Sequence, residues 1–204
     1  SSAASRSFSV GGAAAQTWRE EAASLRRKVE ELFYDPASGC YATRCIAGKR
    51  VAGELHEHVQ IMMLHAGIVP EAKLPRLLAA VFAGNDMVPI TLSVMPYLLE
   101  ALLGRDYGPD ARRYVRRKLE ENYYPMLDGK STTLWETVKG GDDFVYAGSL
   151  CHGWSSLPVY YCGAGLLGVT PLAPGFRRFQ VRPWADGREA AAGEIPTPAG
   201  PIRV

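Results

Sequence analysis

The order in which two hydrophobic periodicities follow one another most constrains the fold of this chain. Up to residue 168, apolar residues recur at three- and four-residue steps, which predicts helices. After it, Phe176, Phe179 and Val181 alternate with polar residues, which predicts a strand. Helices followed by strands indicate a mainly α domain with a small β appendage rather than a βαβ fold. The predicted organisation is a flexible leader (1–15), a helical domain (16–168) and a β-strand segment (169–204).

Six helices are predicted within the helical domain. Prolines and threonines that start helices, and glycines that end them, set the bounds. The predicted ranges are 16–33, 54–65, 70–83, 91–103, 109–123 and 149–166. Joined by short loops, these helices fit three antiparallel α-hairpins, which form either a helical bundle or half of an (α/α)6 toroid. Periodicity does not choose between the two.

Composition and charge exclude several classes of protein. Hydrophobic residues make up 47% of the chain, charged residues 22%, and the net charge is +2, which is ordinary for a globular protein. Basic clusters at 26–28 and 112–118 are interleaved with or followed by acids, which is typical of solvated helix faces, so no nucleic-acid partner is expected. No apolar run approaches the roughly 20 residues that span a membrane.

The cysteines give limited information on the compartment. Cys40, Cys45, Cys151 and Cys162 contain no CxxC pair, which argues against a zinc ribbon or a thioredoxin-like motif. Reduced thiols are expected, and a Cys40–Cys45 bridge is an alternative only in an oxidising compartment. No signal peptide is visible, but the chain begins at Ser1 without a methionine, so the compartment stays open, with the cytoplasm slightly favoured.

Two segments carry candidate chemistry. In the first, Trp135 and Glu136 follow a Gly- and Thr-containing turn, and an aromatic ring beside a carboxylate suits a sugar site. The alternative is a tryptophan packed in the core and an acid at a helix N-terminus. In the second, Ser149 is expected to cap the last helix, which places His152 in its first turn. A packed, hydrogen-bonded histidine is the alternative there.

A third candidate, Glu54-Leu55-His56-Glu57-His58, suggests a metal site but has poor geometry. On a helix, His56 and His58 point about 200° apart. His58 and His65 share a face without an acidic ligand at a suitable step, so no metal is expected. Glu54 is interpreted as an N-terminal acid of the helix and Gln60 as a core-facing residue. Nucleotide-binding and hydrolase-triad motifs are absent, and no cofactor is expected.

Three segments in order resemble glycoside hydrolase family 78, the bacterial α-L-rhamnosidases. They are Thr132-Thr133-Leu134-Trp135-Glu136 (TTxWE), Ser149-Leu150-Cys151-His152 (SLxH) and 168–176 (GIxPxxPGF). The likeness covers about residues 16–204. It implies part of an (α/α)6 toroid followed by the start of a β-sandwich, and hydrolysis of terminal α-L-rhamnosyl linkages with inversion.

The resemblance also implies roles for individual residues. Glu136 corresponds to the catalytic base and His152 to a residue that lines the rhamnose subsite, and Trp135 is expected to shape the pocket. The family's general acid lies in an Asp- and Glu-bearing stretch that this sequence does not contain. We therefore expect the C-terminal part of a rhamnosidase, inactive by itself, with a rhamnosylated glycoside as substrate and either the missing N-terminal half or a second copy as partner.

Two other functions remain open from the sequence. One is a non-catalytic helical module that binds a sugar or a protein. The other is a different six-hairpin glycosidase, such as an uronyl hydrolase or a glucoamylase-like enzyme.

Overall fold

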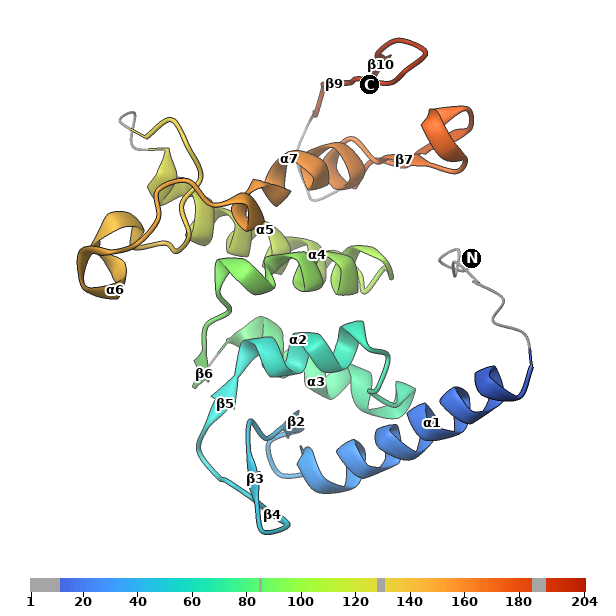
Figure 1. The fold of residues 1–204 in the computed structure, drawn as a ribbon, viewed down its shortest axis with the longest axis vertical. Helices are drawn as coiled ribbons and strands as arrows, with labels where there is room; N and C mark the ends of the chain where they lie inside the picture. The colour runs from blue at the N-terminus through green and yellow to red at the C-terminus, as the bar shows by residue number, and fades with distance from the viewer. Residues whose placement is uncertain (1–11, 85, 128–130, 185–189) are drawn as a thin grey trace. The chain divides into compact units, whose positions relative to one another are not determined.

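A computed structural model of the chain describes residues 12–84, 86–127, 131–184 and 190–204 (Figure 1). The protein is mainly α-helical, and the strands in the described residues form two-stranded pairs. The chain divides into two compact units, an N-terminal unit up to Ile90 and a C-terminal unit from Thr91 to Val204. Leader residues 1–11, Asn85 and loop residues 128–130 lie outside the description.

The N-terminal unit combines three helices with short strands. Its elements are α1 (Ala13–Phe33), β1 (Tyr34–Asp35), β2 (Cys40–Tyr41), β3 (Cys45–Ile46), β4 (Lys49–Arg50), β5 (Leu55–His56), α2 (Glu57–His65), the 3-10 turn η1 (Glu71–Lys73), α3 (Leu74–Ala83) and β6 (Met87–Val88). β1–β2 and β3–β4 are antiparallel pairs, whereas β5 and β6 pair in parallel. Asp35 accepts hydrogen bonds from the backbone N–H groups of Ala37 and Ser38, which forms the tight β1–β2 turn.

Buried polar groups connect α2 to the segments around it. The Gln60 side chain is fully buried and forms two hydrogen bonds of 2.8 Å with Tyr41, one to the backbone N–H and one to the carbonyl. Glu57, 1% exposed, accepts the Ile90 backbone N–H at 2.7 Å. Such partners offset the cost of burying amide and carboxylate groups. The prediction that Gln60 faces the core is confirmed.

The C-terminal unit contains the remaining helices and two antiparallel strand pairs. Its elements are η2 (Leu92–Val94), α4 (Met95–Leu103), α5 (Pro109–Tyr123), η3 (Tyr124–Met126), η4 (Gly140–Asp142), α6 (Asp143–Tyr146), η5 (Gly153–Ser156), α7 (Leu157–Tyr161), the π-helical turn η6 (Cys162–Leu166), β7 (Val169–Pro171), η7 (Pro174–Phe176), β8 (Phe179–Val181), β9 (Glu194–Ile195) and β10 (Ile202–Arg203). α4 packs against α5 and α7, and Met95, Leu98 and Leu99 of α4 are fully buried.

Most helices lie where they are predicted, but several helix starts and one strand end are wrong. α1 begins at Ala13 rather than Gln16. α2 begins at Glu57 rather than Glu54, because Leu55–His56 forms a strand that pairs with Met87–Val88. β8 confirms the predicted strand at Phe179–Val181. Phe176 lies instead in the turn η7, where Gly175 has a φ of 68°.

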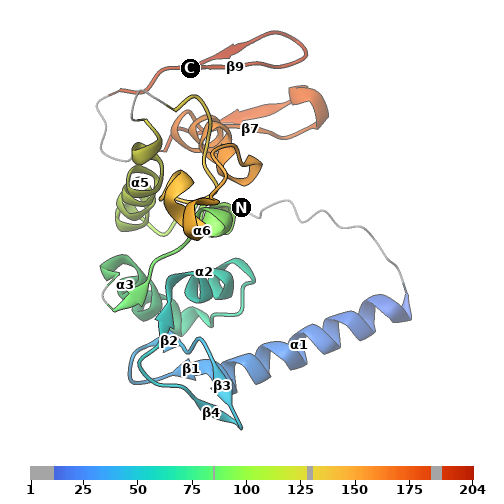
Figure 2. The ribbon, with the colours of Figure 1, turned by 60° about the vertical axis from the view of Figure 1, so that its left-hand side comes forward.

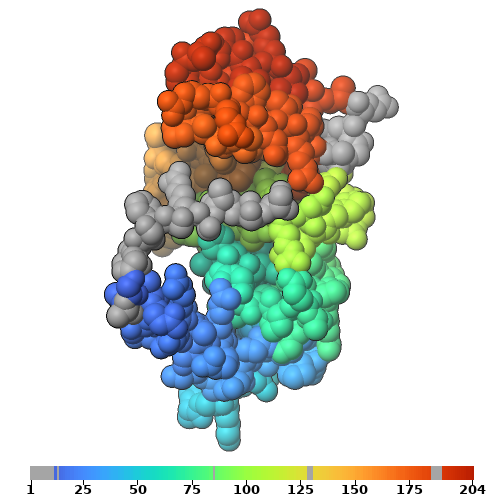
Figure 3. Space-filling view, turned by 90° about the vertical axis from the view of Figure 1, so that its right-hand side faces the viewer, coloured from blue at the N-terminus to red at the C-terminus, as the bar shows by residue number. Residues whose placement is uncertain are grey.

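The apolar stripe of α1 lies largely in solvent. Trp18, Leu25 and Leu32, spaced seven residues apart, are 68%, 61% and 40% exposed. The last turns of α1 contact the unit, where Glu30 accepts a 2.6 Å hydrogen bond from the Tyr41 hydroxyl and pairs with Lys73. Figures 1 and 2 show the N-terminal half of α1 extending beyond the other elements of its unit, and Figure 3 shows the helix at the surface in blue. An exposed stripe of this length is typical of a surface that binds another element.

Substitutions distinguish this stripe from the core. Leu25→Glu is expected to change the free energy of unfolding by no more than about 0.5 kcal/mol, because few contacts are lost. The fully buried Leu77 of α3 is the control: Leu77→Ala is expected to cost about 2–5 kcal/mol. Urea denaturation followed by circular dichroism measures both. An equal cost at the two positions would show that the stripe is packed.

Candidate active site

Two motif segments of the C-terminal unit lie side by side through their backbones. The Glu136 N–H donates to the Ser149 carbonyl, and the His152 N–H donates to the Leu134 carbonyl, both at 2.8 Å. The Thr133 hydroxyl adds a bond to the Leu150 carbonyl. This pairing brings the TTxWE and SLxH segments together and closes residues 137–148 into a loop.

The pairing places two predicted site residues next to each other. A carboxylate oxygen of Glu136 (Oε2) lies 3.9 Å from Nδ1 of His152, and it accepts the Ser149 backbone N–H at 3.2 Å. Their side chains are 21% and 31% exposed, so both are half-buried and both reach solvent. An ionised carboxylate accepts about four hydrogen bonds, so Glu136 keeps capacity for a water molecule or a sugar hydroxyl.

The aromatic ring against this pair belongs to Trp154. Its ring centroid lies 3.9 Å from that of His152 with an interplanar angle of 33°, and its indole N–H donates to the Glu136 carbonyl at 3.0 Å. The next residue, Ser155, is fully buried and donates its hydroxyl to the Trp135 carbonyl at 2.6 Å. Trp154 and Ser155 are not among the site residues predicted from the sequence, although both closely follow His152.

The Trp135 side chain packs against its own loop. A Cβ at Gly140 would lie 2.8 Å from the Trp135 ring, so the loop backbone fits closely onto the indole. The backbone N–H of Trp135 contacts the Met126 sulfur at 3.5 Å. Its indole nitrogen is buried without a hydrogen-bond partner among the described residues. A role for Trp135 in shaping a pocket remains a prediction.

The predicted helix 149–166 is wrong in its first part. Ser149 does not cap a helix, because its hydroxyl accepts the Cys151 N–H at 3.2 Å and donates to the Cys151 carbonyl at 3.0 Å. His152 is extended, with φ −134° and ψ 121°, and precedes η5 instead of lying in a first helical turn. Backbone groups that bond to Leu134 and Glu136 are unavailable to a helix, so regular helix begins only at Leu157.

The loop between the two motifs contains a left-handed turn. Phe144, Val145 and Tyr146 have φ values of 50°, 58° and 66°, and all three side chains are exposed. Non-glycine residues in this region are strained by roughly 1–3 kcal/mol each. The Asp143 carboxylate stabilises the turn by accepting hydrogen bonds from the Thr137 hydroxyl and the Phe144 N–H. Both bonds lower the pKa of this carboxyl, the Thr137 bond more strongly.

The histidine-rich segment of the N-terminal unit differs from its predicted geometry. Because α2 begins after His56, the imidazoles of His56 and His58 contact edge to face, with centroids 5.2 Å apart, instead of pointing in opposite directions. Glu54 is not an N-terminal helix acid but pairs with Arg44, whose Nε lies 3.0 Å from Glu54 Oε2. In the described parts of the chain, no three His, Cys, Asp or Glu side chains are grouped to hold a metal ion.

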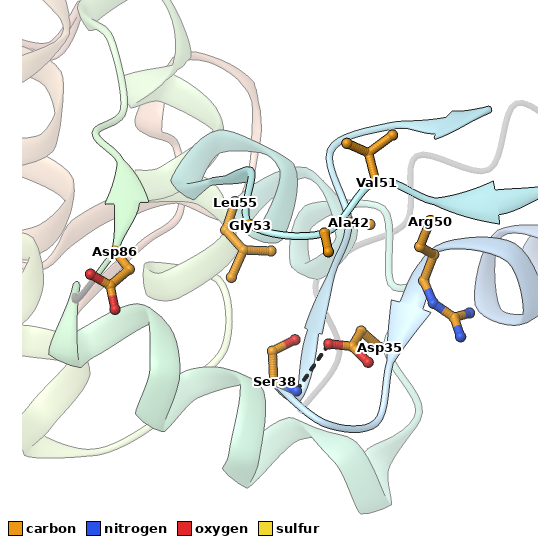
Figure 4. Close-up of a pocket in the computed structure, with 9 residues that line it drawn as sticks. Asp35, Ser38, Ala42, Arg50, Val51, Gly53, Leu55 and Asp86 are labelled. Carbon is orange, nitrogen blue, oxygen red and sulfur yellow. Dashed lines mark hydrogen bonds between the residues drawn. The ribbon is translucent and has the colours of Figure 1, made fainter.

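A pocket of about 450 Å³ lies in the N-terminal unit, away from the candidate motifs in sequence (Figure 4). Asp35, Ser38, Arg50, Leu55 and Asp86 are among its lining residues. The Asp35 carboxylate, which Figure 4 shows bonded to Ser38, is already engaged in its own turn. The pocket has no aromatic wall, and we assign it no sugar-binding role.

The cysteines, all in the part of the chain that the structure describes, form no disulfide bond. The four cysteines are free thiols, with Cys40 buried and Cys151 and Cys162 exposed. Burial raises the pKa of the Cys40 thiol.

Among the helices of the described ranges, none is long and apolar enough to cross a membrane.

Comparison with solved structures identifies the fold. No family model matches the chain, and no curated protein matches its sequence. A GH78 family rhamnosidase of Bacillus sp. GL1 superimposes with a TM-score of 0.77 and 23% identity, over 93% of this chain and 20% of that one. The Streptomyces avermitilis α-L-rhamnosidase, solved with L-rhamnose, gives 0.62 and 19% over 93% and 18%. An Aspergillus terreus α-L-rhamnosidase gives 0.66 and 15% over 93% and 22%.

This chain has the fold of a segment of the α-L-rhamnosidases. The resemblance indicated by the sequence motifs is thus confirmed. The chain spans about a fifth of the length of the rhamnosidase structures it matches. The predicted boundary at residue 168 is untested, and the β7–β8 hairpin belongs to the same compact unit as α4, α5 and α7.

The histidine contact in this rhamnosidase-like chain predicts a pH effect on stability. Burial, and then the neighbouring His56, lowers the pKa of His58 from 6.5. The unfolded chain therefore binds a proton more readily, and stability falls as pH drops through about 6.5 and below. His58→Gln should reduce this loss, measured by urea denaturation between about pH 7.5 and pH 5.5.

The control is a substitution at an exposed residue that carries no titratable group. Leu25→Gln on α1 should leave the pH dependence as in the unmodified chain. An unchanged slope in His58→Gln would contradict the assignment.

Proposed function

We propose that the chain is the C-terminal portion of an inverting α-L-rhamnosidase that hydrolyses terminal α-L-rhamnosyl linkages, with Glu136 as general base. The observation that carries this proposal is the approach of Glu136 to His152, 3.9 Å apart, on the fold of a rhamnosidase segment. In this proposal the helical hairpins form part of an (α/α)6 toroid, and residues 169–204 begin a β-sandwich.

The proposed chemistry is a single displacement in which this chain supplies the general base. The Glu136 carboxylate takes a proton from a water molecule while the water oxygen bonds to the anomeric carbon. The bond from that carbon to the aglycone oxygen breaks, and a general acid across the sugar protonates the leaving oxygen. Glu136 suits the base because one backbone N–H orients its carboxylate and about a fifth of the side chain (21%) stays open to solvent.

His152 and Trp135 are proposed to serve the sugar subsite. The His152 imidazole is 31% exposed, and its ring lies against Trp154, which leaves ring nitrogens to hydrogen-bond sugar hydroxyls. Trp135 contributes by supporting the loop that follows Glu136, through its contact with Gly140.

The second carboxyl group is proposed to come from outside these 204 residues. An inverting glycosidase needs an acid roughly 6.5–9.5 Å from the base, on the other side of the sugar. In the C-terminal unit, the acids nearest to Glu136 in sequence are Asp142 and Asp143. Asp143 is engaged by Thr137 and Phe144, and those bonds lower its pKa, which is opposite to what a general acid requires.

Hydrolysis of p-nitrophenyl α-L-rhamnoside tests the proposal. The isolated chain is expected to release no p-nitrophenol above background, whereas the longer polypeptide that contains it should turn over. In that polypeptide, Glu136→Gln should reduce turnover by at least about 10³-fold, because the amide cannot accept the proton from water.

Glu121→Gln, at an exposed carboxylate of α5, is the matched control and should retain full turnover. Robust release by the isolated chain would contradict the missing-acid argument. Unchanged turnover in Glu136→Gln would exclude Glu136 as the base.

The exposed α1 stripe is proposed to dock on an amphipathic helix from the remainder of the rhamnosidase. The stripe repeats every seven residues at Trp18, Leu25 and Leu32, the spacing of a helix–helix seam. The matched rhamnosidase structures are about five times longer than this chain, so a longer polypeptide of that size has room for the partner segment.

Quenching of tryptophan fluorescence by acrylamide tests this docking. Trp18, 68% exposed here, should be quenched readily in the isolated chain and be protected in the longer polypeptide. The difference between each protein and its Trp18→Phe variant isolates this residue. Protection in an isolated chain that runs as a dimer in size-exclusion chromatography would assign the stripe to a second copy instead.

A further inference from the structure

Trp154 makes two different contacts with the two residues of the candidate site. Its indole N–H donates to the backbone carbonyl of Glu136 at 3.0 Å. Its ring lies 3.9 Å, centroid to centroid, from the imidazole of His152, tilted by 33°. Trp154 therefore contacts both the backbone of Glu136 and the imidazole ring of His152.

The first contact restrains the backbone at Glu136. The Glu136 N–H is already bonded to Ser149, and the indole N–H occupies its carbonyl, so both peptide groups flanking its Cα are fixed. The direction of the Cα–Cβ bond, and with it the reach of the carboxylate, is restrained as a result. The second contact restrains the plane of the imidazole, because offset aromatic faces prefer a limited set of orientations.

The energetic context separates Trp154 from an ordinary core residue. The side chain is 40% exposed, so it is partly open to solvent rather than enclosed in the core. Its neighbour Ser155 forms a comparable hydrogen bond to the adjacent carbonyl, that of Trp135. Ser155 reaches His152 through the backbone, where its N–H donates to the His152 carbonyl at 3.2 Å, whereas the Trp154 ring lies against the imidazole itself.

We propose that Trp154 is a positioning residue that sets the relative orientation of Glu136 and His152 for the sugar. The proposal rests on the proposed function of that pair, and Trp154 acts through the two residues rather than on the reacting atoms. Tryptophan suits this task because it supplies a donor and a flat ring together. Phenylalanine retains only the ring, and leucine retains neither.

The first test uses the isolated chain and a spectroscopic readout. A ring stacked on His152 shifts the imidazole proton resonances upfield in the NMR spectrum. Trp154→Phe should keep most of this shift, Trp154→Leu should abolish it, and Ser155→Ala should leave it unchanged. Resonances that do not move in Trp154→Leu would overturn the proposed contact.

The second test measures turnover of p-nitrophenyl α-L-rhamnoside in the longer polypeptide. Misplacement of a catalytic group by about 1 Å can cost on the order of 10²-fold in rate. Trp154→Leu should lower kcat by about 10- to 100-fold with KM changed less than about threefold, and Trp154→Phe should fall between it and the unmodified enzyme. The exposed Glu121→Gln is the control and should stay within about threefold of the unmodified kcat.

These outcomes separate the positioning role from the proposed function. If Glu136→Gln leaves turnover unchanged, the assignment of the base fails. If Glu136→Gln abolishes turnover but Trp154→Leu matches the control variant Glu121→Gln, only the positioning role fails. If Trp154→Leu does not fold, as judged by circular dichroism, Trp154→Phe decides: a kcat equal to the unmodified enzyme overturns the role of the indole N–H.

Discussion

The backbone pairing between residues 134–136 and 149–152 is the constraint on which the candidate site depends. Two N–H···O=C bonds of 2.8 Å hold the segments together, and the side chains of Glu136 and His152 meet because their backbones do. Peptide groups exchanged between two segments give a more reproducible geometry than contacts between flexible side chains. A carboxylate and an imidazole 16 residues apart in sequence thus become neighbours at half-buried positions.

Buried polar groups perform a similar task in the N-terminal unit. The Gln60 side chain forms hydrogen bonds with both the backbone N–H and the carbonyl of Tyr41, as a neighbouring strand would. The Glu57 carboxylate accepts the backbone N–H of Ile90. Each of these side chains lies in the first half of α2, and each satisfies a backbone group from a distant segment. An apolar substitution at either position would leave a buried peptide group unpaired, which costs about 1–3 kcal/mol.

At three residues, His56, His152 and Trp135, the structure differs from what local sequence patterns predict. Helical periodicity correctly located α2, but it extended the helix over His56, which pairs instead with a strand more than thirty residues later. It also placed His152 within a helix, where the structure has an extended residue held by Leu134. The choice of Trp135 followed its position beside Glu136, whereas the ring that contacts the histidine is that of Trp154.

Residue spacing and type are enough to predict the helical character of the chain, the position of most helices and the three segments that resemble the rhamnosidases. Those properties depend on local spacing and residue type, which can be recognised without knowing which distant segments contact one another. Only the tertiary structure decided where α2 and the last helix begin and which ring lies against His152. The physical reason is that backbone N–H and C=O groups bonded to distant segments cannot also form helical bonds, and no local pattern records that competition.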